Sequence, residues 1–393
     1  MKKLSAHYIF DGICLRKNAI LEIEDSGKIV GLSEERKNIA EAENLSFYNG
    51  ILLPGIINSH QHLELAWMKN RIAGSKGMAG FLNSVAELRK STPEEPTISE
   101  EMRTLDRIMY SQGITAAIDV SNNAESIGVK KDSNIEYFTT VELYGLDSCR
   151  NDEIVRKGEE IVGQFRSKSL NASLTPHSFY LTNTELLKII SCIGNNMVSI
   201  HFFESNEEAC FNVGNDNELS LFLRSFYPPF AIPENYSEII VKTISKIIKT
   251  NKLILVHNTF IPEFLLKSLM ALDNTENLFF CLCPKSNRYI TERLPDLNKF
   301  ISHGCKLLLG TDSPASNPDF NFASELFEIQ QNYPSVSIAE MLQWCTSNPA
   351  EIFCCKGNMG SFITGTSPGI VLLENAYLPN LSLTSSSIFR RLF

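Results

Sequence analysis

Residues 51–62 read ILLPGIINSHQH, an apolar run that ends in two histidines one residue apart. Positions i and i+2 of a β-strand point to the same side, so His60 and His62 are expected to converge where this strand ends. Two converging imidazoles suit a first-row transition metal such as zinc. A His-x-His pair by itself is common, so the prediction of a metal site depends on what the rest of the chain adds.

Three later apolar segments also end in metal-type residues: VSIHFFE at 198–204, LILVHN at 253–258 and LLLGTD at 307–312. Strands that all present functional groups at their C-terminal ends are typical of a (β/α)8 barrel. Eight short apolar runs are predicted to be its strands, at residues 51–58, 115–120, 135–143, 172–176, 198–203, 253–258, 278–283 and 306–310. Helix-like segments fall between them, at 98–111, 152–165, 184–193, 236–249, 262–272 and 323–332, and this alternation indicates a parallel sheet.

The bulk properties of the chain exclude several classes of protein. A length of 393 residues fits one large domain and a small one. A formal charge of −9 offers no electrostatic footprint for nucleic acid. No apolar run approaches the roughly 18 residues of a membrane span, and the first residues lack the apolar core of a signal peptide. The ten cysteines include no Cys-x-x-Cys pair, which favours reduced thiols in a cytoplasmic protein.

The run PGIINSHQHLE at residues 54–64, taken with the three later segments, resembles the amidohydrolase superfamily. Within it, the chain is most similar to mononuclear aminohydrolases, which include aminodeoxyfutalosine, guanine, cytosine and S-adenosylhomocysteine deaminases and triazine hydrolases. The resemblance covers essentially the whole chain. It implies a (β/α)8 TIM-like barrel over residues 54–356. It also implies a small composite β-sandwich domain made from residues 1–53 and 357–393, since the two termini pair beside the barrel in this family.

The resemblance assigns His60, His62, His201 and Asp312 as ligands of one divalent metal ion. Three imidazoles and a carboxylate suit zinc first, and iron or manganese would also fit. The fourth predicted strand, 172–176, has no lysine, so the carboxylated-lysine bridge of binuclear relatives is not expected. The sequence therefore predicts a mononuclear site.

Three residues are expected to perform the chemistry. Glu204 follows His201 in the His-x-x-Glu arrangement of the mononuclear aminohydrolases, where this glutamate shuttles a proton; a helix-capping glutamate is the structural alternative. His257 matches a histidine that supports the attacking hydroxide or the developing oxyanion, although a further ligand or a packed core histidine are alternatives. Asp312 is expected to bind metal and also to take a proton from the attacking water.

Substrate contacts are predicted for Glu64, His177 and Asn287 from the corresponding family positions. Asn287 could instead cap a loop. Glu142, on the third predicted strand, is interpreted as structural. One superficial match is excluded: His62-Leu63-Glu64 fits the His-x-Glu of cytidine-deaminase-type zinc enzymes, but their Pro-Cys-x-x-Cys partner is missing.

Two segments are expected to lie over the mouth of the barrel. Residues 74–80 read GSKGMAG and predict a flexible loop rather than a phosphate-binding one, because they follow no strand. Residues 206–234 look like an insertion after the fifth strand that could help to form a lid.

The leading hypothesis is a metal-dependent hydrolytic deaminase that acts on an amino-substituted heterocycle, either aminodeoxyfutalosine-like or purine- or pterin-like. Hydrolysis of another C–N bond or of a C–Cl bond is the alternative within enzymes. A non-catalytic barrel scaffold is the alternative of another class, and retention of every ligand argues against it. The expected partner is a small-molecule substrate, with no nucleic acid and no membrane, and a homodimer is left open.

Overall fold

The computed structural model describes residues 1–33, 44–74, 76–193, 197–212, 215–226, 236–353 and 358–393. Its central feature is two four-stranded parallel sheets whose strands follow one another in chain order. The first sheet contains β6 (Ile56–Gln61), β7 (Ile114–Ser121), β8 (Glu136–Leu143) and β9 (Asn171–Pro176). The second contains β10 (Met197–Phe202), β11 (Lys252–His257), β12 (Leu278–Leu282) and β13 (Lys306–Leu309).

Two isolated parallel bridges join the sheets into a closed ring. Ser178 pairs with His201 at the junction of β9 and β10, and Gln61 pairs with Asp312 at the junction of β13 and β6. The main-chain N–H of His201 donates to His177 O at the first junction. Each of the eight predicted runs overlaps a strand of this ring, and both junctions lie beside residues that were expected to bind metal.

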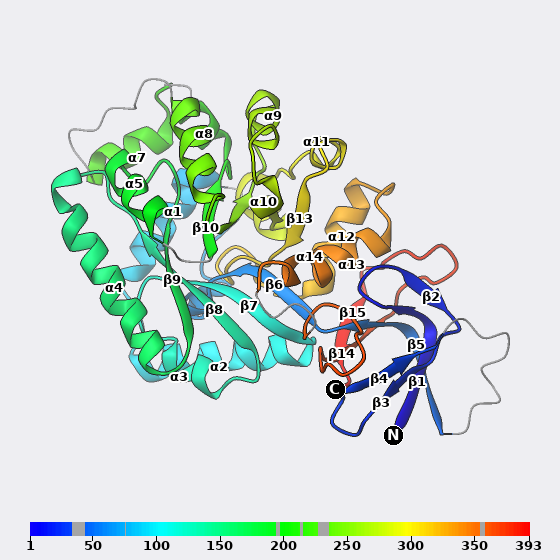
Figure 1. Ribbon diagram of the computed structural model, residues 1–393. Coiled ribbons are helices and arrows are strands. Elements are labelled where there is room, and N and C mark those ends of the chain that lie inside the picture. The colour runs from blue at the N-terminus through cyan, green and yellow to red at the C-terminus, as the bar shows by residue number, and fades with distance from the viewer. Residues whose placement is uncertain (34–43, 75, 194–196, 213–214, 227–235, 354–357) are drawn as a thin grey trace.

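Helices surround this barrel, as Figure 1 shows. The strands are apolar and buried on both faces, as in LILVH of β11 and LFFCL of β12, because side chains inside the barrel and helices outside both cover them. The α-helices are α1 (Gly77–Arg89), α2 (Glu95–Ser111), α3 (Ile127–Asp132), α4 (Asn151–Ser167), α5 (Thr184–Cys192), α6 (Asn206–Phe211), α7 (Glu218–Phe226), α8 (Tyr236–Ile247), α9 (Glu263–Met270), α10 (Pro284–Thr291), α11 (Leu297–Ser302), α12 (Phe322–Asn332), α13 (Ile338–Trp344) and α14 (Ser347–Ala350). Short 3₁₀ turns cover Leu63–Met68, Ser148–Arg150 and Thr275–Asn277.

The two ends of the chain meet in one mixed seven-stranded sheet beside the barrel (Figure 1). It is built from β1 (Lys2–Phe10), β2 (Leu15–Lys17), β3 (Leu21–Ile23), β4 (Ile29–Leu32), β5 (Leu45–Pro54), β14 (Ile370–Glu374) and β15 (Ile388–Arg391). Strand β5 lies in the middle, parallel to β1 on one side and antiparallel to β14 on the other. Both termini thus contribute to one sheet, while the proposed boundary at 356–357 falls outside the described residues.

The predicted strand 51–58 is wrong in one respect, because it is two strands. Strand β5 ends at Pro54 and belongs to the terminal sheet, whereas β6 begins at Ile56 and belongs to the barrel. Gly55 separates them, and a Cβ there would lie only 2.3 Å from both Pro368 O and Thr115 Cγ2. Other segments of the chain approach the backbone so closely at this corner that only glycine fits.

The predicted loop at 74–80 is also corrected, since α1 begins at Gly77. Gly77 has a φ of +66°, so it turns the chain into a helix whose apolar positions then repeat at helical spacing. In the predicted insertion 206–234 the structure describes α6 and α7, and residues 213–214 and 227–234 lie outside the described part.

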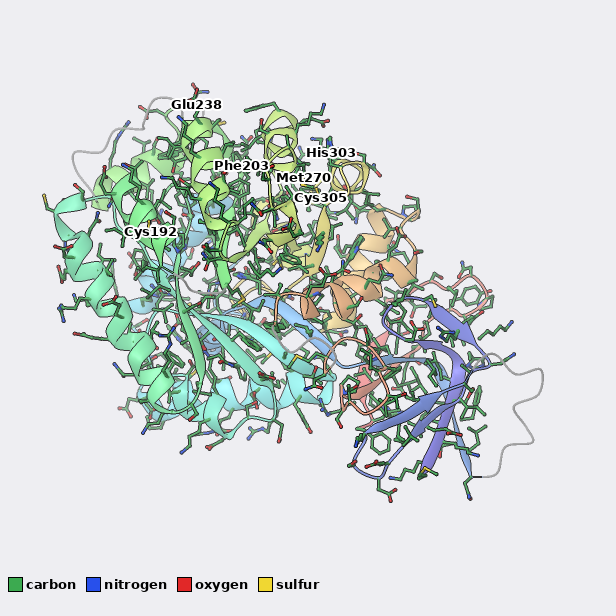
Figure 2. The ribbon with its side chains drawn as sticks, in the orientation of Figure 1. Cys192, Phe203, Glu238, Met270, His303 and Cys305 are labelled. Atoms are coloured by element: carbon green, nitrogen blue, oxygen red, sulfur yellow. The ribbon has the colours of Figure 1, made fainter. Side chains whose placement is uncertain are left out.

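None of the described helices combines the length and the apolar character needed to cross a membrane. His303, at the C-terminal end of α11, lies on the outside of the barrel near Cys305 (Figure 2). It pairs with Glu263 at 3.6 Å and is partly exposed.

Candidate active site

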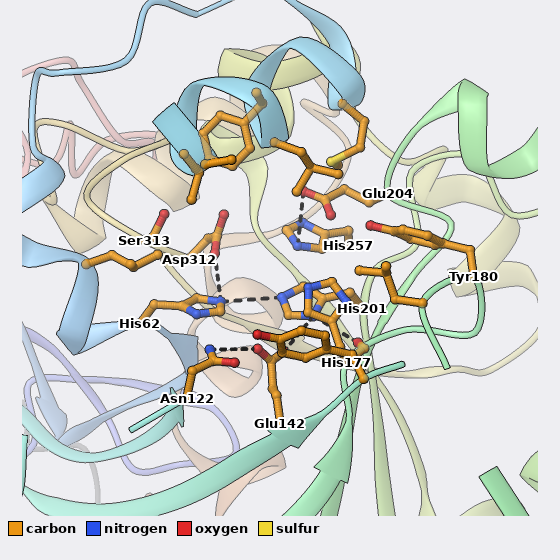
Figure 3. Close-up of a pocket in the computed structure, with 18 of the residues that line it drawn as sticks. His62, Asn122, Glu142, His177, Tyr180, His201, Glu204, His257, Asp312 and Ser313 are labelled. Atoms are coloured by element: carbon orange, nitrogen blue, oxygen red, sulfur yellow. Dashed lines mark hydrogen bonds and ion pairs between the residues drawn. The ribbon is translucent and has the colours of Figure 1, made fainter. Parts of the chain in front are cut away.

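Four side chains converge where β6, β10 and β13 end, as Figure 3 shows for three of them. Nε2 of His62 lies 3.2 Å from Nε2 of His60 and 3.3 Å from Nε2 of His201. Asp312 Oδ1 lies 3.5 Å from His60 Nε2 and 3.4 Å from His62 Nε2. The structure thus brings together all four residues that were predicted to bind metal.

These distances suit one divalent transition-metal ion. Tetrahedral ligands placed about 2.0–2.2 Å from an ion are separated by roughly 3.3–3.6 Å, close to the spacings seen here. His62 Nε2 faces two other imidazole nitrogens, and it cannot form a normal hydrogen bond with both of them. A cation among the three lone pairs removes this conflict. His60, His62 and Asp312 form one group of side chains that could hold a divalent metal ion, and His60, His201 and His257 form another.

Burial keeps two of the histidines in the form that binds metal. It lowers the pKa of His60 and of His62 to about 4, so both rings are neutral near pH 7. Burial alone would lower the pKa of His201 too, but its hydrogen bond to Glu142 and that carboxylate's charge raise it to about 9. Nδ1 of His201 keeps its proton in either case, and a cation at Nε2 would replace only the second proton.

Two of the predicted metal ligands, Asp312 and His201, are held in place by contacts with neighbouring residues. Asp312 Oδ2 accepts hydrogen bonds from Ser286 Oγ at 2.5 Å and from Ser316 Oγ at 2.7 Å, which leaves Oδ1 directed toward the histidines. His201 Nδ1 faces His177 O at 3.0 Å and Glu142 Oε1 at 3.2 Å. Such partners fix the orientation of a ligand and its tautomer.

Glu204 and His257 face each other beside this cluster. Glu204 Oε1 lies 3.4 Å from His257 Nε2, and both side chains are buried in the wall of the same cavity. Burial raises the pKa of Glu204 well above its ordinary value, so its carboxyl group can carry a proton at neutral pH. His257 Nδ1 donates to Asn287 Oδ1 at 2.8 Å, which leaves Nε2 with its lone pair toward the cavity.

Backbone strain gathers at the same strand ends. His257 has a φ of +74° and Asp312 a φ of +56°, in the left-handed region that non-glycine residues rarely adopt. Such conformations persist where the surrounding structure enforces them, and they are frequent at functional sites.

The three predicted substrate contacts occupy different places. His177 lines the cavity, with its ring stacked 4.6 Å from that of His201. Glu64 lies behind the lining, where it accepts hydrogen bonds from the backbone and side chain of Asn122 at 2.8 and 3.1 Å. Asn287 is fully buried behind His257. For Glu64 and Asn287, the structure shows a supporting position instead of an exposed one.

Sequence reasoning missed Glu142 as a member of this site. It is the second-to-last residue of β8, lines the cavity and contacts His201. Burial alone would raise its pKa, but the nearby imidazoles of His177 and His201 hold the pKa below its ordinary value. Its signal was present in the sequence, because it lies at a barrel strand's C-terminal end like the ligands.

The cavity above the cluster has a volume of about 390 Å³. One face of α1 forms a wall, with apolar side chains at helical spacing that end at Arg89. The opposite wall is mostly aromatic and apolar. The residues that α1 contributes are Met78, Phe81, Leu82, Val85, Ala86 and Arg89, and those opposite include Tyr144, Tyr180, Leu181 and Phe222.

Comparison with known proteins places this arrangement in a family. The model of the amidohydrolase family matches residues 51–389. An adenosine deaminase from Helicobacter pylori is 25% identical over 350 residues, which cover 84% of this chain and 82% of that protein. A 5-methylthioadenosine/S-adenosylhomocysteine deaminase from Pyrococcus furiosus is 22% identical over 325 residues, with 79% and 72% covered.

Two solved structures share the fold over almost the full length. Helicobacter pylori aminofutalosine deaminase in complex with methylthio-coformycin superposes with a TM-score of 0.76 at 19% identity, and 95% of this chain and 92% of that chain are covered. A zinc complex of the atrazine chlorohydrolase from Arthrobacter aurescens gives a TM-score of 0.70 at 16% identity, with 97% and 90% covered. The family match and the converging barrel residues lead to one conclusion: this chain is a member of the amidohydrolase family, with a (β/α)8 barrel and a small β-sandwich domain.

Proposed function

We propose that this protein is a zinc-dependent aminohydrolase that replaces an exocyclic amine of a nitrogen heterocycle with a carbonyl group and releases ammonia. The observation that carries the proposal is the position of Glu204. This buried carboxyl group, whose pKa burial raises well above its ordinary value, faces the cavity beside the cluster of His60, His62, His201 and Asp312. The deaminases among the relatives support the choice of reaction.

The proposed metal site uses His60, His62, His201 and Asp312. Three imidazoles and one carboxylate suit zinc, and a site with these ligands leaves room for water. When bound, the ion would acidify a water molecule and so provide a nucleophile at neutral pH.

The residues of the chain would then divide the proton transfers between them. Asp312 accepts the proton that the attacking water loses, and the water oxygen bonds to the amine-bearing ring carbon. Glu204 delivers its proton to the neighbouring ring nitrogen, as a general acid. His257 Nε2, fixed by the bond of Nδ1 to Asn287, accepts a hydrogen bond from the attacking water and orients it. Asp312 then gives its proton to the amine, the carbon–nitrogen bond breaks and ammonia leaves. The hydroxyl proton passes back to Glu204 as the carbonyl forms, which restores both carboxyl groups.

The shape of the cavity supports a substrate larger than a bare heterocycle. With the reacting ring near Asp312 and Glu204, a substituent would extend along the apolar face of α1 toward Arg89. Arg89 and Tyr144 both line the cavity, and among the described residues no carboxylate lies within ion-pair distance of Arg89. Its guanidinium is therefore available to an anionic group on that substituent.

A substrate panel tests the proposal directly. Purified protein would be loaded with zinc and incubated with aminopurines, their nucleosides, 5′-substituted adenosines, pterins and aminotriazines, while ammonia release is measured. We expect turnover of at least one amino-heterocycle, lost on chelation and restored by zinc. Chloride release from chlorotriazines without any ammonia release would instead point to the dehalogenating reaction, and the deaminase proposal would fail.

A further inference from the structure

A second buried charged pair lies below the metal cluster, outside the cavity. Lys130 of α3 and Asp119 of β7 form an ion pair at 2.5 Å, and both side chains are 0% exposed. Lys130 Nζ also donates to Ser121 Oγ at 3.1 Å and to Thr139 Oγ1 at 2.9 Å, so all three of its protons are used. Buried ion pairs are often no more stabilising than apolar residues of similar volume, which leaves the function of this pair open.

Asp119 holds the backbone on one side of His62 and a side chain on the other. Its Oδ1 accepts the main-chain N–H of Leu63 at 2.7 Å and Gln61 Nε2 at 3.2 Å. Leu63 and Gln61 are the two chain neighbours of His62. The carboxylate therefore fixes the chain direction at the point where this ligand leaves the strand.

The regular strand ladder does not supply this restraint. The register between β6 and β7 shifts between Asn58 and Gln61, so His60 and its neighbours leave the regular pairing. Irregular pairing of this kind redirects side chains, and it is common beside active sites. The backbone that carries the two histidines needs an anchor from outside the ladder, and Asp119 provides it.

The same network continues to the fourth ligand. Gln61 Oε1 accepts a hydrogen bond from Asn58 Nδ2 at 3.0 Å, and that amide also donates to Thr311 Oγ1 at 2.8 Å. The main-chain N–H groups of Thr311 and Asp312 both donate to His60 O at 3.0 Å. A continuous set of buried hydrogen bonds thus links the Lys130–Asp119 pair with the strand ends that present His60, His62 and Asp312.

We propose that Lys130 and Asp119 are positioning residues for the metal centre. Lys130 holds the Asp119 carboxylate in place, Asp119 holds the Gln61–Leu63 turn, and the turn keeps His62 Nε2 at its distance from His60, His201 and Asp312. This inference rests on the proposed metal site but not on any particular substrate or reaction.

The test compares metal affinity with fold stability in the full-length protein. Lys130→Met keeps the length of the side chain and removes its charge. We expect its dissociation constant for Zn²⁺, measured by competition with a chromophoric chelator without substrate, to rise roughly 10–100-fold, as for other partners of metal ligands. The melting temperature of the metal-free protein is measured in parallel.

Lys306→Met, at a partly exposed lysine that also pairs with a carboxylate, is the control. Lys306 Nζ pairs with Glu351 at 2.6 Å, at the N-terminal end of β13 and thus at the opposite end of the barrel from the ligands. We expect this variant to keep its Zn²⁺ affinity within about twofold of the wild-type value, even if its melting temperature falls. The difference between the two variants separates positioning from general stabilisation.

A spectroscopic signature and a milder variant keep the proposal testable if Lys130→Met does not fold. Asp119→Asn retains an oxygen for the Leu63 N–H but loses the charge that holds Lys130, so weaker Zn²⁺ binding and an altered visible spectrum of the Co²⁺-loaded protein are expected. Wild-type affinity and an unchanged Co²⁺ spectrum in whichever of these variants folds would overturn the positioning role. A wild-type protein that binds no metal in the same titration would instead overturn the proposed metal centre.

Discussion

Glu142 Oε1 lies 3.2 Å from His201 Nδ1, while Nε2 of the same ring faces His62 Nε2 at 3.3 Å. The imidazole thus connects a buried carboxylate on one side with the ligand cluster on the other. A carboxylate behind a metal-binding histidine fixes its tautomer and increases its basicity. Asn122 Nδ2 donates to the other oxygen of Glu142 at 3.1 Å and holds it in this position.

Glu142→Gln should therefore weaken metal binding without emptying the site. The amide keeps a similar shape but loses the negative charge, so we expect the dissociation constant for Zn²⁺ to rise about 10-fold or more. Chelator competition measures it. Glu136→Gln, at the exposed start of the same strand, is the control and should bind Zn²⁺ like the wild type. Equal affinities in both variants would mean that Glu142 has no influence on His201.

Glu204→Gln should separate chemistry from metal binding. The amide cannot deliver a proton, so we expect full metal content with ammonia release reduced about 10²–10⁴-fold. Glu238→Gln, on the exposed side of α8 (Figure 2), removes an acidic group elsewhere and should leave turnover unchanged. Loss of metal from Glu204→Gln, or near-normal turnover, would show that Glu204 is a ligand or a helix cap.

The metal stoichiometry should be one ion per chain. The strand β9, with the sequence NASLTP, has no lysine that could form a bridging carbamate. Elemental analysis of the zinc-loaded protein should give about one equivalent, and His201→Ala should reduce it to a small fraction because a ligand is lost. His257→Asn should retain the metal and lose turnover. Two equivalents that are both needed for activity would contradict the mononuclear site.

Arg89→Met should change substrate preference while sparing the chemistry. A charge-assisted hydrogen bond contributes about 1.5–3 kcal/mol, so kcat/KM should fall roughly 10–100-fold for a 5′-thioether adenosine that ends in a carboxylate. The matching carboxamide should be almost unaffected. Arg103, an exposed residue of α2, provides the control variant Arg103→Met. If the wild type deaminates both compounds equally well, Arg89 does not recognise an anion.

Removal of residues 364–393 should make the protein insoluble. It deletes β14 and β15 and leaves the apolar edge of β5, including the buried Leu52 and Leu53, without a partner. The soluble fraction after expression, followed by size-exclusion chromatography, measures the effect. Ile388→Ser, which changes only one exposed side chain of β15, is expected to remain soluble. A soluble and active truncation would contradict a shared terminal domain.

The ligand set could be predicted from the sequence because barrel strands give strong local signals. Each strand is a short apolar run, and its C-terminal end is where functional side chains gather, so His201, His257 and Asp312 stood out as candidates by position. The choice of His201 and Asp312 as ligands came from the family resemblance. The division of the first apolar run into β5 and β6 at Gly55 could not be predicted. The apolar pattern continues across the corner, and only tertiary contacts separate the two strands.

The walls of the cavity were less predictable than its floor. Three glycines near residue 77 resemble a loop, yet the packing of the partly buried Phe81, Leu82 and Val85 against the core outweighs the low helix propensity of glycine. Asn122 covers Glu64, and His257 covers Asn287, so neither side chain is exposed to the cavity. Such coverage arises from contacts between distant segments, and no local pattern encodes it.

The place of β5 in the terminal sheet has a consequence for synthesis on the ribosome. Strands β1, β3 and β5 can pair soon after they emerge, but the other edge of β5 must wait for β14. At typical rates of about 5–20 residues per second, translation of the roughly 300 residues between them takes about 15–60 s. During that interval the nascent chain carries an apolar, unpaired strand edge that is open to chaperones or to aggregation. Conditions that slow translation of the barrel should therefore lower the yield of native protein even when the finished fold is stable.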